Sequence, residues 1–294
     1  MSSDVEREIG TQPQMWRRAS EVAASDASRL PARGDRIAAV GCGTSWFVAQ
    51  AYAARREAAR HGVTDAFTAS EMPAGRSYDA VVAISRSGTT TEVARCLSGL
   101  SAGERKVAIT AVAGSPVAEA ADEVILLDFA DERSVVQTRF ATTALAMLRA
   151  SLGEDLAPAV ADCDGALVRP LPAGIEAFGH FVFLGRGWTV GLANEAALKF
   201  REAAGAWSES YPAMEYRHGP ISAAGPGTLV WSLGGVEDDL LRDAAATGAT
   251  VVASELVPMA ELVVAQRAAV ALAGSKGLDP DRPRHLTRSV VLPD

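Results

Sequence analysis

The chain has few of the residues that mark disulfide-bonded or zinc-binding proteins. Its three cysteines, Cys42, Cys96 and Cys163, are odd in number and widely separated among 294 residues. This spacing predicts neither a disulfide framework nor a paired-cysteine zinc site. We therefore expect no metal ion, and a reducing cytoplasm is the simplest setting for the protein.

Long apolar runs and an excess of positive charge are also missing. No stretch approaches about 18 uninterrupted apolar residues, the length of a membrane helix. The opening MSSDVEREIG is acidic where a secretion signal would be basic and then apolar. We expect a protein that is neither exported nor membrane-spanning. The net charge of -8 and the pI near 5.2 argue against nucleic acid or anionic lipid as partners, so an anionic ligand must be bound locally.

The composition and periodicity that are present predict a globular α/β protein. Hydrophobic residues make up 48% of the chain and charged residues 22%, and the length suits two domains. Short aliphatic runs alternate with alanine-rich helical segments such as 46–59 and 192–204, which is typical of a parallel sheet with helices on both faces. The expected strands are 37–40, 80–84, 106–110, 124–127, 181–184, 228–232, 250–253 and 290–292.

The two halves of the chain resemble each other. AAVGCGTSWFVAQAYAARRE in the first half and VFLGRGWTVGLANEAALKFRE in the second each read as a strand, a Gly-x-Gly turn and an alanine-rich helix. The segment RPLPAG at 169–174 suits a linker. We predict two tandem, doubly wound parallel-sheet units, 1–165 and 166–294.

The segment GCGTS, residues 41–45, ends one expected strand and opens a helix. Its glycines let the backbone approach a ligand, and the helix N-terminus offers amides and hydroxyls to a phosphoryl group. A dinucleotide is disfavoured, because the third glycine of Gly-x-Gly-x-x-Gly would fall at Trp46.

A second such segment, ISRSGTTTE at 84–92, follows the next expected strand and again opens a helix. Four hydroxyls lie within six residues, on Ser85, Ser87, Thr89 and Thr90, and Arg86 is expected to add a cationic clamp. The two loops should converge at one crevice. The alternative is that both are ordinary helix N-caps, where Ser and Thr are preferred.

The second half carries candidate groups for proton transfer. In NEAALKFRE, Glu195, Lys199 and Glu202 share a helix face, although a solvated Glu and Lys pair would have the same spacing. His218 precedes Gly219 and Pro220, which places its imidazole in a turn, where a structural role is the commoner one. Sugar-phosphate chemistry would use both kinds of group: a histidine to open the pyranose ring, and a glutamate to remove the carbon 2 proton.

Taken together, these segments resemble the SIS (sugar isomerase) family, and within it the isomerase half of glucosamine-6-phosphate synthase. The resemblance runs in the family's order from EREIGTQP to DRPRHLTRSVVL and includes GCGTS, ISRSGTTTE, ERSVVQTRFATTAL, LGRGWTVGLANEAALKFRE and EYRHGP. It implies two SIS-type units that bind a sugar phosphate without a cofactor.

The resemblance also implies roles for individual residues. Glu202 corresponds to the base that moves the carbon 2 proton. His218 corresponds to the ring-opening histidine, which the family contributes from the neighbouring subunit, so a homodimer is implied. The remaining implied contacts are those to the phosphate, Thr44, Ser45, Ser85, Arg86, Ser87 and Thr90, and those near the sugar, Val135, Gln137 and the tail residue Arg288.

Several departures limit the reaction that can be expected. The family's tail lysine, which forms an imine with a ketose phosphate, is replaced by Arg288, and a protonated arginine cannot form one. Arg86 stands where the synthase has an uncharged amide, and Gln137 replaces a small hydroxyl residue. No glutamine-hydrolysing domain is expected in this chain, so ammonia transfer from glutamine is not expected from it alone.

What remains is enolisation of an aminosugar 6-phosphate. With a free amine, the products are ammonia and fructose 6-phosphate; with an N-acetyl group, the same enolate can expel the carbon 3 hydroxyl as water. The alternatives are isomerisation of an ordinary aldose phosphate, cleavage of a sugar-amine 6-phosphate adduct, a non-catalytic sugar-phosphate sensor and a nicotinamide-dependent enzyme.

Overall fold

The computed structural model describes residues 2–293, which form two compact units, each built on one parallel sheet. The sheet A unit contains residues 11–157 and 287–293, and the sheet B unit contains residues 2–10 and 158–286. The predicted boundary at residue 165 assigns residues 2–10 to the first unit and residues 287–293 to the second, whereas each of these segments packs with the other unit. Each end of the chain therefore packs with the half of the sequence that is remote from it.

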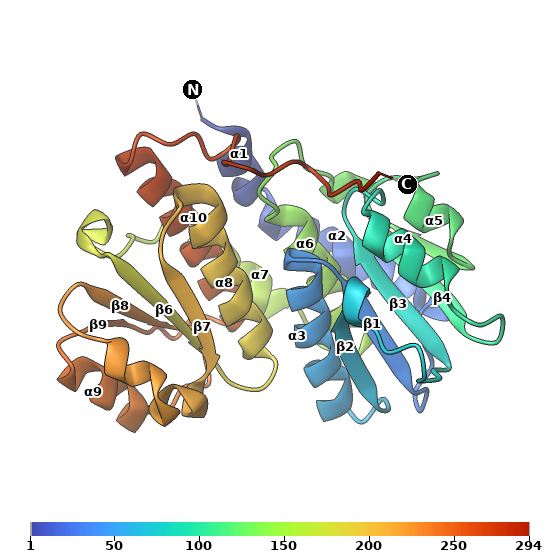
Figure 1. The fold of residues 1–294 in the computed structure, drawn as a ribbon, viewed down its shortest axis with the longest axis horizontal. Helices are drawn as coiled ribbons and strands as arrows, with labels where there is room; N and C mark the ends of the chain where they lie inside the picture. Colours follow the sequence, from blue (N-terminus) through green and yellow to red (C-terminus); the bar gives the residue numbers. More distant parts are fainter. Residues whose placement is uncertain (1, 294) are drawn as a thin grey trace. The chain divides into compact units, whose positions relative to one another are not determined.

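The sheet A unit has five parallel strands in the order β2-β1-β3-β4-β5 (Figure 1). The strands are β1 (Ile37–Gly41), β2 (Thr64–Thr68), β3 (Ala80–Ser85), β4 (Arg105–Thr110) and β5 (Glu123–Leu126). The helices are α2 (Gln12–Ser25), α3 (Thr44–Ala58), α4 (Thr91–Ser98), α5 (Pro116–Glu119) and α6 (Arg139–Ser151), with 3-10 turns η1 (Ala27–Arg29), η2 (Ala69–Glu71) and η3 (Asp128–Ala130).

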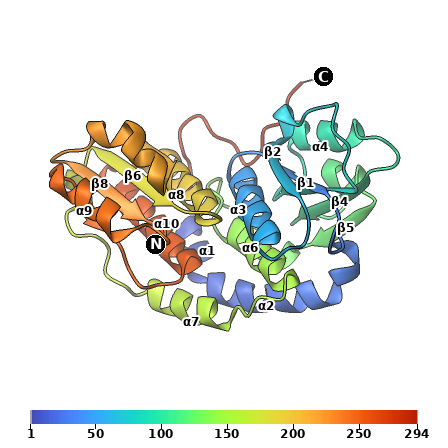
Figure 2. The same ribbon diagram turned by 90° about the horizontal axis from the view of Figure 1, so that it is seen from below.

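Helices cover both faces of sheet A because its strands are apolar on both faces. Alternate residues of β3, Val81 and Ala83, pack against Val93 and Leu97 of α4. Helix α3 contacts β1 and β2, and α6 packs against both α2 and α3. Figure 2 shows α3 and α6 of this unit on the side of the sheet away from α4.

The sheet B unit has four parallel strands in the order β7-β6-β8-β9. The strands are β6 (His180–Gly185), β7 (Ser208–Pro212), β8 (Thr228–Ser232) and β9 (Thr250–Val252). The helices are α1 (Asp4–Gly10), α7 (Ala157–Ala166), α8 (Thr189–Ala204), α9 (Asp238–Ala246) and α10 (Pro258–Ser275), with 3-10 turns η4 (Ile175–Ala177), η5 (Ala213–His218) and η6 (Pro220–Ala223).

An aromatic cluster forms the core on one face of sheet B. Phe200 of α8 lies with its ring centroid 4.7 Å from that of Phe181, 5.0 Å from Phe183 and 6.5 Å from Trp231. Helix α10 packs beside α8 over this face. On the other face, Val182 and Val230 pack with Leu240 of α9. The α/β fold expected from the sequence, with two parallel-sheet units, is confirmed.

The strand predictions differ from the structure in three places. β2 and β7 were not expected, because the sequences TDAFT and SESYP are largely polar; both are edge strands, paired on one side only. The prediction of a terminal strand at 290–292 is wrong: this segment is not part of a sheet, and Val290 and Val291 are 52% and 67% exposed. Among residues 2–293, no helix has both the length and the apolar character needed to cross a bilayer.

Phe200→Ala is expected to lower the free energy of unfolding by about 3–5 kcal/mol, because it leaves a cavity among three aromatic rings. Trp207→Ala is the matched control, since Trp207 is 71% exposed and its removal should cost no more than about 0.5 kcal/mol. Urea denaturation followed by circular dichroism measures both. Similar losses in the two variants would contradict the assignment of Phe200 to the core.

Candidate functional site

The first candidate loop, residues 41–45, connects β1 to α3 in the sheet A unit. A Cβ added to Gly41 would lie 2.6 Å from the carbonyl carbon of Ser45, so only glycine fits there. Gly43 has a φ of 54°, which glycine adopts without strain. Thr44 and Ser45 are only 4% and 3% exposed at the start of the helix. The backbone amides of the first turn and these hydroxyls are therefore held together at one helix N-terminus.

The second candidate loop, residues 85–90, connects β3 to α4. The Ser87 hydroxyl accepts hydrogen bonds from the Thr89 amide at 3.2 Å and the Thr89 hydroxyl at 3.0 Å. Ser85 and Ser87 are 3% and 7% exposed. β1 and β3 are adjacent parallel strands, with Val40 paired to Ala83, so both loops begin at the carboxyl ends of neighbouring strands of sheet A. Ligands of open parallel sheets bind at the carboxyl ends of the strands.

Gly88 lies at the tightest point of the second loop. Its φ is +65°, and a Cβ there would lie 1.9 Å from the hydroxyl oxygen of Ser115. Ser115 is 4% exposed, and its hydroxyl has no hydrogen-bond partner within residues 2–293. The loop conformation thus depends on a glycine for two independent reasons.

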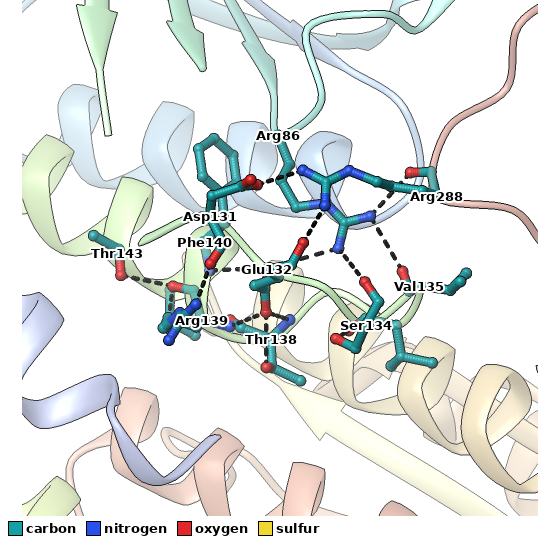
Figure 3. A network of polar contacts seen from close by, with 12 residues as sticks. Arg86, Asp131, Glu132, Ser134, Val135, Thr138, Arg139, Phe140, Thr143 and Arg288 are labelled. Carbon is teal, nitrogen blue, oxygen red and sulfur yellow. Dashed lines mark hydrogen bonds and ion pairs between the residues drawn. The ribbon is translucent and has the colours of Figure 1, made fainter. Parts of the chain in front are cut away.

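Arg86 is fully buried and contacts the chain itself. Its guanidinium donates to the carbonyl oxygens of Ser134 at 2.9 Å, Val135 at 3.3 Å and Arg288 at 2.9 Å (Figure 3). The carboxylate of Glu132 lies 3.7 Å from it. This placement differs from the direct cationic clamp that the sequence suggested. Arg86 instead joins the second loop to segment 131–138 and to the C-terminal tail.

Glu132 organises the segment that carries Val135 and Gln137. One of its carboxylate oxygens accepts hydrogen bonds from the Thr138 amide and hydroxyl and from the Arg139 amide, at 2.7–2.9 Å. The other oxygen accepts from the Phe140 amide at 3.2 Å (Figure 3). The carboxylate therefore caps the N-terminus of α6, where negative charge is favoured. Glu132 was not among the site residues expected from the sequence, although a glutamate shortly before a helix start is a recognisable signal.

The residues expected near a sugar lie on this segment and on the tail. Val135 and Gln137 are both partly exposed, and the side-chain oxygen of Gln137 accepts no hydrogen bond from the described residues. The Arg288 guanidinium donates to the Glu132 carbonyl and lies 2.5 Å from the Asp131 carboxylate. Arg288 is thus engaged with segment 131–138 (Figure 3).

The C-terminal tail, residues 287–293, runs beside the second loop. The hydroxyls of Ser289 and Thr89 are 2.8 Å apart, and the Val290 carbonyl accepts a hydrogen bond from the Thr91 amide at 3.2 Å. The Leu292 amide donates to the Thr91 hydroxyl at 2.9 Å. These contacts place the tail against the start of α4.

In the sheet B unit, three ionisable residues of α8 form a buried cluster. Nζ of Lys199, which is 1% exposed, lies 2.5 Å from a carboxylate oxygen of Glu202 and 3.3 Å from one of Glu195. Burial alone would lower the pKa of Lys199, but the carboxylates of Glu195 and Glu202 more than offset burial, and the pKa is raised. The sequence left open a solvated pair on this helix; the structure places the lysine in the interior.

Glu202 also lines a cavity of about 680 Å³ at the C-terminal ends of α8 and α10. Its side chain is 19% exposed, so the same carboxylate can contact Lys199 and remain accessible from the cavity. The size lies within the range of small-molecule sites.

His218 ends η5, as the expected turn position requires, and its side chain is exposed. It is not among the residues that line the Glu202 cavity, and no hydrogen bond or ion pair of its imidazole is found within residues 2–293. The same part of the chain holds no cluster of three or more His, Cys, Asp or Glu residues that could bind a metal ion.

Gly88→Ala is expected to destabilise the protein by about 2 kcal/mol more than Gly114→Ala, because the added methyl group collides with Ser115. Gly114 is a matched control: its φ is +63°, so the backbone strain is the same, but a Cβ there meets nothing within 4 Å. The difference between the free energies of unfolding of the two variants, measured by chemical denaturation, isolates the cost of the collision with Ser115. Equal destabilisation would show that Ser115 does not constrain the loop.

Comparison with known proteins agrees with this architecture. Residues 32–152 match the SIS domain. A glutamine–fructose-6-phosphate aminotransferase of Sulfurisphaera tokodaii is 30% identical, over 88% of this chain and 50% of its own length. The corresponding aminotransferase of Bacillus subtilis is 27% identical, over 91% of this chain and 53% of its own. The chain therefore spans about half the length of these relatives.

Solved structures resemble the whole chain. The glucosamine-6-phosphate deaminase of Thermotoga maritima has a TM-score of 0.84 and 27% identity, with 99% of this chain and 100% of that chain covered. Tagatose-6-phosphate ketose/aldose isomerase of Escherichia coli shares the fold, with a TM-score of 0.77, 19% identity and coverage of 99% and 97%. The resemblance seen in the sequence is confirmed: the chain contains an SIS domain and is homologous to the isomerase half of glutamine–fructose-6-phosphate aminotransferase.

Proposed function

We propose that the protein is an enzyme that converts an aminosugar 6-phosphate by opening its ring and removing the proton from carbon 2. The observation that carries the proposal is Glu202: a carboxylate that lines a ligand-sized cavity and is held by a buried lysine. The similarity to a protein named as a glucosamine-6-phosphate deaminase supports the choice of substrate class.

The phosphate ester would be bound by the two loops of the sheet A unit. The proposed contacts are the hydroxyls of Thr44, Ser45, Ser85, Ser87 and Thr90 and the amides at the starts of α3 and α4. Hydroxyls and helix N-termini suit a phosphoryl group without a metal ion. Arg86 would act by holding the second loop and segment 131–138 in place. Val135 and Gln137 on that segment are the proposed neighbours of the sugar.

His218 would move the proton between the ring oxygen and the carbon 1 hydroxyl, which opens the pyranose to the aldehyde. Glu202 would then take the proton from carbon 2 and return it to carbon 1. Lys199 is the less suited base, because the carboxylates of Glu195 and Glu202 outweigh burial and raise its pKa, which favours its protonated form. Its ammonium group would keep the Glu202 carboxylate oriented.

With a free amine, the proton transfer converts the aldehyde to a carbon 2 imine with a carbon 1 hydroxymethyl group. Addition of one water gives a carbinolamine, and loss of ammonia gives fructose 6-phosphate. No imine with the protein is needed, which fits Arg288 and its pairing with Asp131. With an acylated nitrogen, the same base would instead lead to loss of the carbon 3 hydroxyl as water.

The test is to incubate the protein in deuterated water with glucosamine 6-phosphate or its N-acetyl form, and to follow the carbon 2 proton by NMR. We expect exchange or loss of that signal, with free ammonia or an unsaturated sugar as the product. Glu202→Gln should reduce turnover by at least about a hundredfold while sugar-phosphate binding persists. Glu176→Gln, at an exposed glutamate in η4, is the control and should retain full activity. Unchanged turnover in Glu202→Gln would refute the proposal; thermal stabilisation by sugar phosphates without any turnover would favour a sensor.

We also propose that His218 acts in the neighbouring subunit of a homodimer, because it is exposed and lies outside the Glu202 cavity of its own chain. Inactive Glu202→Gln and His218→Asn proteins, unfolded and refolded together, should then recover about a quarter of wild-type activity. Half of the dimers would contain one subunit of each variant. In each mixed dimer, one of the two sites would combine an intact Glu202 with an intact His218, so a quarter of all sites would be active. No recovery from dimers shown to have exchanged subunits would contradict the shared arrangement.

A further inference from the structure

A third loop, residues 111–115, follows β4 at the same end of sheet A as the two candidate loops. β4 is the neighbour of β3, with Ser85 paired to Thr110, so this loop begins beside the start of the second loop. The strands β1, β3 and β4 are consecutive and parallel in the sheet, and a loop of interest begins at the carboxyl end of each. A ligand bound at these strand ends can therefore contact the third loop as well as the other two.

Backbone hydrogen bonds hold the third loop against the second. The Ala111 amide donates to the Arg86 carbonyl at 3.1 Å. The Thr110 hydroxyl, at the end of β4, donates to the same carbonyl at 3.3 Å. The Val117 amide, just beyond the third loop, donates to the Gly88 carbonyl at 2.9 Å. These bonds fix the third loop relative to the second on both sides of its own sequence.

Ser115, the last residue of the third loop, is buried against the centre of the second. Its side-chain oxygen lies 1.9 Å from the position that a Cβ on Gly88 would occupy, so it fills the space left by the missing side chain. The residue is 4% exposed. Its hydroxyl does not cap α5, and it has no hydrogen-bond partner in the part of the chain that the structure describes.

An unpaired hydroxyl is unfavourable in such a place. A buried hydroxyl gives up its hydrogen bonds to water, and buried polar groups that find no replacement are rare in folded proteins. Two hydroxyls nearby are engaged within the sheet A unit: that of Thr110 donates to Arg86, and that of Ser87 accepts from the Thr89 amide. The Ser115 hydroxyl is instead a donor that the fold leaves available at the middle of a phosphate-type loop.

We propose that Ser115 donates a hydrogen bond to the phosphoryl group of the substrate and so adds the third loop to the phosphate site. This inference rests on the proposed function, in which the second loop binds the phosphate. A phosphoryl group offers three acceptor oxygens, so hydroxyls from adjacent loops can bind the same group. A hydrogen bond to a charged acceptor is about twice as strong as a neutral one. Ser115 therefore contributes to binding of the phosphate ester and not to the choice of sugar.

Calorimetric titration with glucosamine 6-phosphate and with sorbitol 6-phosphate tests the proposal, since the two ligands share the phosphate and differ at carbons 1 and 2. Ser115→Ala should weaken the binding of both about tenfold, because each loses the same hydrogen bond to a charged acceptor. The thermal midpoint of the free protein should not fall, since the hydroxyl that is removed has no partner within residues 2–293. Ser115→Cys, which keeps a similar volume but is a weak donor, should show the same loss of affinity.

Ser208→Ala is the matched control. Ser208 is 8% exposed in the sheet B unit, and its hydroxyl donates to the Ala197 carbonyl at 2.7 Å. This variant should have the opposite signature: a lower thermal midpoint, and an affinity for both ligands that stays within about twofold of the wild type.

Unchanged affinity in both Ser115 variants would overturn the proposal and assign the hydroxyl to an ordered water. A loss confined to one of the two ligands would also overturn it, because the contact would then be to the sugar. If the wild type binds neither ligand, the proposed function fails, and this inference with it. Binding of glucosamine 6-phosphate without turnover would refute the proposed chemistry and leave the phosphate contact standing.

Discussion

One buried carboxylate, that of Glu132, organises the candidate site in the sheet A unit. It caps α6 and thereby fixes the path of segment 131–138, whose carbonyl groups then accept the hydrogen bonds of Arg86. Without that cap, the segment that carries the Ser134 and Val135 carbonyls would lose four hydrogen bonds, and two of the three carbonyl partners of the buried Arg86 guanidinium would be less firmly placed. Arg86 in turn joins the second loop to segment 131–138 and to the C-terminal tail, so this helix cap positions two of the three carbonyl groups through which these segments meet.

The sequence predicted features that local chemistry decides. Both glycine and hydroxyl loops were placed correctly at strand ends, because strand, turn and helix signals are all local. Edge strands were missed where polar residues such as those of SESYP pair on one side only, so that periodicity is weak. The aliphatic end at 290–292 looked like a strand but has no sheet to join. The hydrogen bonds of this segment to Thr91 join residues that are far apart in the chain, so they cannot be predicted from a short stretch of sequence.

The same distinction explains the ionisable residues. Helical spacing correctly put Glu195, Lys199 and Glu202 on one face of α8, but it could not tell a solvated pair from a buried one. Burial is decided by how α8 packs in the sheet B unit, and it turns a surface pattern into a charged cluster with restricted geometry. Likewise, Arg86 in a phosphate-type loop suggested a ligand contact, whereas its 1% exposure and three carbonyl partners assign it to holding the chain.

The exchange of the chain ends between the units determines how the protein can be divided into fragments that fold. The sheet B unit includes residues 2–10, and the Asp281 carboxylate binds the first amides of α1. The sheet A unit includes residues 287–293, which supply an acceptor to Arg86. A single break in the polypeptide near residue 158 therefore yields two fragments that each carry the terminus of the other unit. Independent folding of either half would require moving an end segment as well as cutting the chain.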